Sequence, residues 1–379
     1  MKIVTIRETT LDMAEATRNA AVGFGRMTAS VAVVEVETAA GHRVRGFAID
    51  SPGRYASGAV LRERLAPRVL AADPAAYVDA SGTLPDPWKI RALAMRDEKP
   101  GGHGERAAAM GLLDGAIWDL IGKLQDKPLW SVLRGPKPGV PSVPVYATCG
   151  FYRDEDDLPR LEDELERAID LGFDTVKIKG GALDLDADRR RIDLALECLG
   201  GKAKLALDCN ATMTLDEARA FLGIIADLPI AWVEEPVDPL DYDAHRALAA
   251  EFAVPLGTGE NLFSAADARN LLRHGGLRPD RDLLQFDIGL GHGLVEYLRI
   301  VAEAEEAGWT REHFVPHVGY RFALQVAAGL GLGRHEVGPF QRIAYRPAMI
   351  GAGASPGEAP GIGWEADPIF ADLFAVLDR

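Results

Sequence analysis

The chain has 379 residues, of which 47% are hydrophobic and 26% are charged. These values are typical of a soluble protein with a sizeable core, and the length suits a large barrel or two to three domains. The formal net charge of −15 argues against a nucleic-acid partner, because such binding needs Lys and Arg clustered against phosphate. A small anionic substrate remains compatible with this charge, since a few local cations or a metal ion can reverse the potential in one cleft.

The cysteines and the apolar runs indicate a cellular compartment. Cys149, Cys198 and Cys209 are odd in number and lack metal-type spacing, which argues against a disulfide framework and for a reducing environment. No uncharged apolar run is long enough to span a bilayer, and the first residues lack a signal-peptide pattern. We therefore expect a cytoplasmic protein without a membrane partner.

The first part of the chain predicts an α+β capping domain over residues 1–124. Strand-like segments lie at 3–10 and 30–49, and the AAGH stretch inside the second predicts a hairpin turn. Helical patterns follow at 59–72 and 105–125, where apolar residues recur at helical spacing.

Residues 125–345 have a different pattern, in which short apolar strands alternate with amphipathic helices. Such alternation predicts a parallel sheet, and seven or eight units predict a closed barrel. A Rossmann fold is the competing interpretation, but no predicted strand is followed by GxGxxG at a helix start. The remaining residues, 346–379, are expected to return to the capping domain. The predicted strands are 143–148, 175–179, 204–208, 230–235, 255–260, 283–287 and 313–317.

Three acids end successive predicted strands, and chemistry in such barrels sits where strands end. Asp208, Glu234 and Glu260 are spaced by 26 residues each (234 − 208 and 260 − 234), about the length of one strand-helix unit. The three carboxylates should therefore converge, and they would repel one another without a cation. An all-oxygen ligand set suits Mg²⁺. The alternative is that the three acids lie apart and pair with lysines on the rim.

Two lysines end another predicted strand. Lys177 and Lys179 lie two residues apart and should share one face of it. The ammonium group of Lys177 would favour the neutral, proton-accepting form of Lys179.

Asp287 and His317 end two neighbouring strands across the barrel mouth from these lysines. A carboxylate that accepts a hydrogen bond from imidazole raises its basicity, so this pair could form one acid/base unit. The whole arrangement fits proton abstraction next to a carboxylate, with the metal stabilising the enediolate and a base on each face.

These motifs resemble a known family. The strand-end KxK, the DCN, VEEP and GEN motifs and the His-Asp pair are similar to those of the enolase superfamily, mandelate racemase group. The resemblance covers the whole chain and implies a modified (β/α)₇β barrel. It implies Mg²⁺ on the three carboxylates, Lys179 as one base with Lys177 as its electrostatic modulator, and His317 with Asp287 as the second acid/base. Glu336 would hydrogen-bond the substrate carboxylate, and a homo-oligomer is expected.

Within this group, stretches such as DEKPGGHGER and TGENLF resemble the D-tartrate dehydratases. That resemblance implies elimination of water from a small-molecule carboxylic acid to give a 2-keto acid, with D-tartrate to oxaloacetate as the best single substrate. Pro52 and Tyr320 depart from the pattern, where those enzymes carry Asn and a second His, so a related diacid or sugar acid is the alternative. The implied substrate-binding residues are Arg18, Asn19, Arg54, Tyr55, His103 and Asn210.

Three other functions are compatible with this sequence. A racemase or epimerase would employ Lys179 and His317 as opposed bases. A Schiff-base aldolase would employ one of the two lysines as a nucleophile. A non-catalytic binding protein would retain the fold alone.

Overall fold

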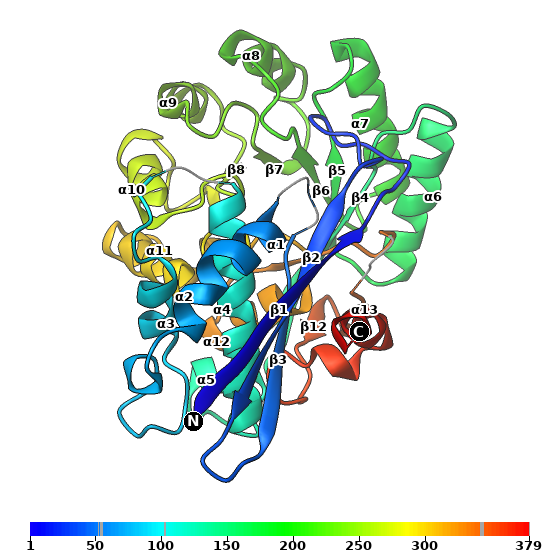
Figure 1. Cartoon of the computed structure of the whole chain (residues 1–379). Coiled ribbons are helices and arrows are strands. Elements are labelled where there is room, and N and C mark those ends of the chain that lie inside the picture. The colour runs from blue at the N-terminus through cyan, green and yellow to red at the C-terminus, as the bar shows by residue number, and fades with distance from the viewer. Residues whose placement is uncertain (52, 54–55, 102–103, 342–344, 379) are drawn as a thin grey trace.

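The computed structural model describes residues 1–51, 53, 56–101, 104–341 and 345–378. A small antiparallel sheet with its helices precedes a barrel of parallel strands (Figure 1). The prediction of a modified (β/α)₇β barrel with an α+β cap is confirmed. The domain boundaries after residues 124 and 345 stay a prediction.

The cap is a three-stranded sheet covered by a long helix. Strands β1 (Lys2–Asp12), β2 (Thr28–Glu37) and β3 (Arg43–Ile49) pair antiparallel in that order, and Thr38 donates to the His42 carbonyl at the hairpin turn. Helix α4 (Glu105–Leu124) is buried along most of its length and packs on β2 and β3. The other cap helices are α1 (Ser57–Val60), η1 (Leu61–Leu65), α2 (Ala66–Leu70), η2 (Pro74–Ala76) and α3 (Pro87–Ala94).

The helix predicted over 59–72 is a composite. Its middle, η1, is a π-helical turn between α1 and α2. Pro67 stands two residues after this turn, and because proline has no N–H it cannot continue the regular hydrogen-bond ladder.

The barrel strands run parallel in the order β4 to β9, and β10 pairs with β4 on its other side. None of the helices within the described residues is both long and apolar enough to cross a membrane. The strands are β4 (Val143–Cys149), β5 (Thr175–Lys179), β6 (Lys204–Asp208), β7 (Ile230–Glu234), β8 (Leu256–Thr258), β9 (Leu283–Leu284) and β10 (His335–Val337). The helices are α5 (Leu129–Arg134), α6 (Asp157–Asp170), α7 (Leu185–Leu199), α8 (Leu215–Ile224), α9 (Tyr242–Glu251), α10 (Ala265–His274), α11 (Leu294–Glu306) and α12 (Arg321–Leu330).

The strand predicted over 313–317 is reduced to a single bridge between Phe314 and Leu284. A 3₁₀ turn, η3 (Arg311–His313), occupies its start, and Pro316 has no N–H for a ladder hydrogen bond. The ring still closes here, because Val315 donates to the Leu284 carbonyl and Gly333 donates to that of Phe314.

The C-terminal tail contacts both the barrel and the cap. It forms β11 (Ala348–Ile350), β12 (Gly353–Ser355), η4 (Trp364–Ala366), α13 (Pro368–Phe374) and η5 (Ala375–Asp378). Strand β12 pairs with β4 of the barrel. The ring of Phe374 lies 4.9 Å from that of Phe47 on β3, and Ile362 donates to the Asp119 carboxylate of α4 at 2.6 Å.

Helix α4 also meets the loop that follows Asp287, at a glycine that we predict is required there. A Cβ on Gly111 would lie 1.8 Å from the carbonyl oxygen of Gly289, so Gly111→Ala should destabilise the fold by about 1–3 kcal/mol. Denaturant unfolding measures this change. The control is Gly223→Ala in α8, where nothing lies within 4 Å and the alanine should be neutral or stabilising by up to about 1 kcal/mol. Equal effects of the two substitutions would contradict the close contact.

Candidate active site

Strand register brings three charged residues into one row at the carboxyl ends of the strands. Lys179 of β5 lies opposite Asp208 of β6, and Asp208 lies opposite Glu234 of β7. Parallel strands in register point equivalent residues to the same side, so these side chains converge inside the barrel mouth. Glu260 joins them from the turn after β8, where Gly259 has a φ of 133°.

The three predicted metal ligands form a cluster. Asp208, Glu234 and Glu260 each offer an oxygen, and these oxygens lie within 4.8 Å of one another. Asp208 and Glu234 are buried, and burial together with the Asp208 and Glu260 charges raises the pKa of Glu234, against the lowering effect of Lys177.

The cluster fits a hard divalent cation. Oxygen Oε2 of Glu260 is buried and accepts no hydrogen bond from the described residues; His317 Nε2 lies 3.4 Å from it, which leaves its lone pairs available to a metal ion. An all-carboxylate donor set is the one that Mg²⁺ prefers. The alternative had the three acids lying apart and paired with lysines: the acids lie together, but Asp208 and Glu234 do pair with Lys179 and Lys177.

The two lysines reach this cluster from one face of β5, as predicted. Nζ of Lys177 lies 2.8 Å from both oxygens of Glu234, 3.7 Å from Asp208 and 3.6 Å from Glu336. Burial lowers the pKa of Lys177, but the Glu234 and Glu336 carboxylates outweigh it and hold this pKa well above its usual range. Lys179 donates to Asp208 and lies 5.0 Å over the ring of Phe151. Lys177 is therefore held as an ammonium beside Lys179.

His317 and Asp287 form the predicted pair. Nδ1 of His317 lies 2.7 Å from Asp287, whose other oxygen accepts the Leu290 N–H at 2.7 Å. The second ring nitrogen, Nε2, lies 3.4 Å from Glu260. Burial lowers the pKa of His317, but the charges of Glu260 and Asp287 raise it to about 10 overall. The imidazole is thus held as a proton donor whose Nε2 faces the carboxylate cluster.

Glu336 lies on the last strand, β10, at the same mouth. Its carboxylate accepts the Val318 N–H at 3.2 Å and the Tyr146 hydroxyl at 3.5 Å. Burial raises its pKa, while Lys177 and His317 lower it to about 2. Glu336 therefore stays ionised between the lysine and the imidazole.

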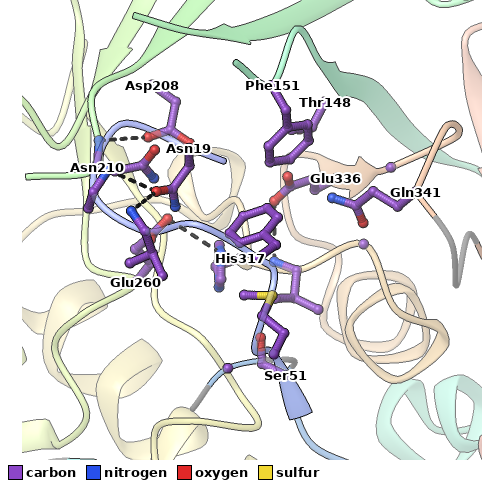
Figure 2. A pocket seen from close by; sticks show the side chains of 18 of the residues that line it. Asn19, Ser51, Thr148, Phe151, Asp208, Asn210, Glu260, His317, Glu336 and Gln341 are labelled. Carbon is purple, nitrogen blue, oxygen red and sulfur yellow. Dashed lines mark hydrogen bonds and ion pairs between the residues drawn. The ribbon is translucent and has the colours of Figure 1, made fainter. Parts of the chain in front are cut away.

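Six of these groups line a cavity with a volume of about 730 Å³, namely Lys177, Lys179, Asp208, Glu260, His317 and Glu336. Figure 2 shows Asp208 and Glu260 on one side, Glu336 and Gln341 on the other, and His317 between them. An apolar wall of the cavity includes Phe24 and Phe151, whose rings meet edge to face at 5.5 Å.

The predicted substrate-binding residues divide into three groups. Asn19 and Asn210 line the cavity, and the Asn210 side chain accepts the Ala20 N–H at 3.3 Å. Arg18 does not line it: its guanidinium lies 4.8 Å over the ring of Tyr152. Arg18 forms an isolated bridge with Tyr152, whereas Asn19 begins a turn in which its side-chain oxygen accepts the Ala21 and Val22 N–H groups. Arg54, Tyr55 and His103 lie outside the described residues.

Two uncharged neighbours of the carboxylates were not predicted from the sequence. Gln285 donates to Glu234 at 2.5 Å, and Asn261 donates to Glu235 at 2.6 Å and to Glu260 at 3.4 Å. Both are uncharged, so the pattern of ionisable residues at strand ends does not include them. Their positions in the sequence could have identified them, because Asn261 follows Glu260 directly and Gln285 precedes Asp287 by two residues on the same strand segment.

Comparison with protein families gives one assignment. Residues 160–369 match the model of the Enolase C-terminal domain-like family. The matched range begins in α6 and ends at the start of α13, so it contains the two lysines, the three clustered carboxylates, the His-Asp pair and Glu336.

Individual relatives are named after reactions of sugar acids. Arabinonate dehydratase from Saccharolobus solfataricus is 30% identical over 217 residues, 57% of this chain and 56% of that protein, so this chain spans little more than half of its length. The 3,6-anhydro-alpha-L-galactonate cycloisomerase from Streptomyces coelicolor is 30% identical over 273 residues, 70% of this chain and 72% of that protein. A solved structure of L-talarate dehydratase from Polaromonas sp. JS666, complexed with Mg and L-glucarate, gives a TM-score of 0.77 at 27% identity and covers 94% of this chain and 92% of that one.

The carboxylate cluster predicts a metal affinity that depends on Glu260. Glu260→Gln should weaken Mg²⁺ binding on the order of 100-fold, because even outer partners of a metal site contribute 10–100-fold, and calorimetric titration measures this. The matched control is Glu162→Gln. Glu162 is an exposed residue of α6, away from the carboxylate cluster, so this substitution should leave the affinity unchanged. Equal losses in the two variants would contradict the assignment of the ligands.

Proposed function

Because the chain belongs to the enolase superfamily, through the Enolase C-terminal domain-like family, we propose that it is a Mg²⁺-dependent dehydratase of hydroxy-acids. The observation that carries the proposal is the placement of Lys179 and His317, which contact the carboxylate cluster through Asp208 and Glu260 respectively. A base and an acid held on either side of one cation site suit removal of a proton and of a hydroxyl from adjacent carbons. The names of the relatives, an arabinonate dehydratase and a talarate dehydratase, support this reaction class.

The metal would be held by Asp208, Glu234 and Glu260. When bound there, Mg²⁺ supplies positive charge beside the substrate carboxylate and so lowers the free energy of the enediolate. Glu336 is fixed next to Lys177 and the Val318 N–H, where its ionised carboxylate can accept a hydrogen bond from a substrate hydroxyl.

The proton steps are assigned to this chain's own side chains. Lys179, once its ammonium proton has left, takes the proton from the carbon next to the carboxylate. The bond from the next carbon to its hydroxyl then breaks, and the hydroxyl leaves as water with the proton of His317 Nε2. The enol that remains tautomerises to a 2-keto acid. Asp287 keeps the imidazole oriented, because it occupies Nδ1.

A sugar acid is a better candidate for the substrate than D-tartrate. Two relatives carry names of five- and six-carbon sugar acids. The cavity of about 730 Å³ lies in the upper part of the usual range for small-molecule sites, about 300–1,000 Å³, and leaves room beyond a four-carbon diacid. D-tartrate, with oxaloacetate as its product, remains the shorter candidate.

The same geometry also suits epimerisation, which is the second candidate function. Lys179 and His317 contact different carboxylates of the cluster, so they could act as bases on opposite faces of one carbon. A Schiff-base aldolase that uses Lys177 as its nucleophile is disfavoured. A nucleophilic lysine must be neutral, whereas the neighbours of Lys177 hold it as an ammonium.

Activity screening with Mg²⁺ should reveal 2-keto acid formation from a member of the tartaric, aldonic or aldaric acids. With that substrate, Lys179→Met should lower kcat/KM by about 10²–10⁴, the usual contribution of a general base. The control is Lys202→Met, which changes an exposed lysine in the turn before β6 and should leave kcat/KM unchanged. If the wild-type protein exchanged or inverted the α-carbon of these acids without forming keto acid, epimerisation would replace dehydration as the function.

The two proton-transfer roles can be separated in D₂O. His317→Asn should lower keto acid formation by about 10²–10⁴, whereas exchange of the α-proton should continue because Lys179 is intact. NMR of the substrate signal measures the exchange. Loss of exchange and elimination to the same extent would show that His317 is needed for proton abstraction and would contradict its role as the acid for the leaving group.

A further inference from the structure

A second cavity lies beside the C-terminal tail, outside the carboxylate cluster. Its volume is about 500 Å³. Its lining comes from the start of α12, from the chain after β10, and from the segments around β12 and the start of α13; it includes Arg321, Tyr345, Arg346, Ser355 and Asp367.

Arg321 is a largely buried residue with no ion pair among the described residues. The residue is 9% exposed, and Nε donates to the Ile362 carbonyl at 2.9 Å. Its terminal nitrogens have no hydrogen-bond or ion-pair partner within the described part of the chain. Since Arg321 lines the cavity, this free edge of the guanidinium can pair with an anion there.

The backbone around Arg321 leaves room for its guanidinium. A Cβ on Gly363 would lie 3.0 Å from two of its nitrogens, and one on Gly357 would lie 3.2 Å from Nη2. Both glycines have positive φ, 79° and 77°, which favours glycine. The ring of Tyr345 covers the group from another side, with its centroid 5.3 Å from Cζ.

Further donors line the same cavity. Arg346 is exposed and uses one nitrogen for the Pro339 carbonyl at 3.1 Å, which leaves the rest of its guanidinium available. The Ser355 oxygen accepts the Gly357 N–H at 3.2 Å, so its hydroxyl hydrogen is free to donate. Asp367 is the acid of the described lining, and its carboxylate already caps the backbone of Ile369.

We propose that this cavity binds a small oxyanion, a phosphate or a carboxylate, between the guanidinium groups of Arg321 and Arg346. The planar fork of arginine matches the oxygens of both groups, and the Ser355 hydroxyl adds a neutral donor. Gln341 lines both this cavity and the one with the carboxylate cluster, so the oxyanion site adjoins the candidate active site but uses none of its ionisable residues.

Calorimetric titration of the full-length protein at constant ionic strength tests the proposal, with metal ions removed beforehand so that the anion cannot bind through a cation at the carboxylate cluster. One arm uses inorganic phosphate and the other uses malonate, so that the two sources of oxyanion are distinguished. Binding in either arm is expected, and Arg346→Gln should weaken it about tenfold or more, since hydrogen bonds to charged groups contribute about that much. Arg246→Gln is the matched control, because Arg246 is an exposed arginine on α9 that pairs with Asp243, and it should leave the affinity unchanged.

A second variant addresses the buried group. Arg321→Met should abolish binding and remove the rise in melting temperature that the anion gives to the wild-type protein. If this variant does not fold, the affinities of Arg346→Gln and Arg246→Gln still show whether the anion binds at this cavity. The proposal is overturned if neither phosphate nor malonate binds, or if Arg346→Gln binds as tightly as the wild-type protein.

Discussion

A buried charge must find a counter-charge, and the barrel mouth is built around this constraint. Within the described residues, three cationic side chains, Lys177, Lys179 and His317, face five carboxylates there. The carboxylates outnumber the cations even while Lys179 carries its proton, so negative charge remains that a divalent cation can balance. The carboxylates are Asp208, Glu234, Glu260, Asp287 and Glu336. The same lysines that balance the acids thus leave a place for a divalent cation and stand next to it as reacting groups.

The fold supplies the positions of these charges through strand register rather than through a special loop. Lys179, Asp208 and Glu234 share one row because β5, β6 and β7 pair in parallel with equivalent ends. The helix α4 of the cap meets the loop after Asp287 at Gly111, so the cap and the acid/base pair are packed against each other. A small shift of either would therefore move the imidazole relative to the lysines.

Much of this arrangement could be predicted from the sequence because it follows from periodicity. Acids spaced by one strand-helix unit must converge in a parallel barrel, and the two lysines of TVKIK must share a face. Periodicity could not predict that Asn19 faces the cavity while Arg18 packs on Tyr152, because the segment has no regular pattern. It also missed that Pro316 reduces a predicted strand to one bridge at Phe314. The Arg321 cavity joins segments far apart in the chain, so no local pattern marks it.

The account depends most on one divalent cation lying between the lysines and the imidazole. Anomalous diffraction from a crystal soaked in Mn²⁺, which shares the preference of Mg²⁺ for carboxylate oxygens, locates that cation directly. The account predicts one strong peak within bonding distance of Asp208, Glu234 and Glu260, with Lys179 and His317 on opposite sides of it. A peak elsewhere, or ordered density for the three carboxylates with no peak among them, would contradict it.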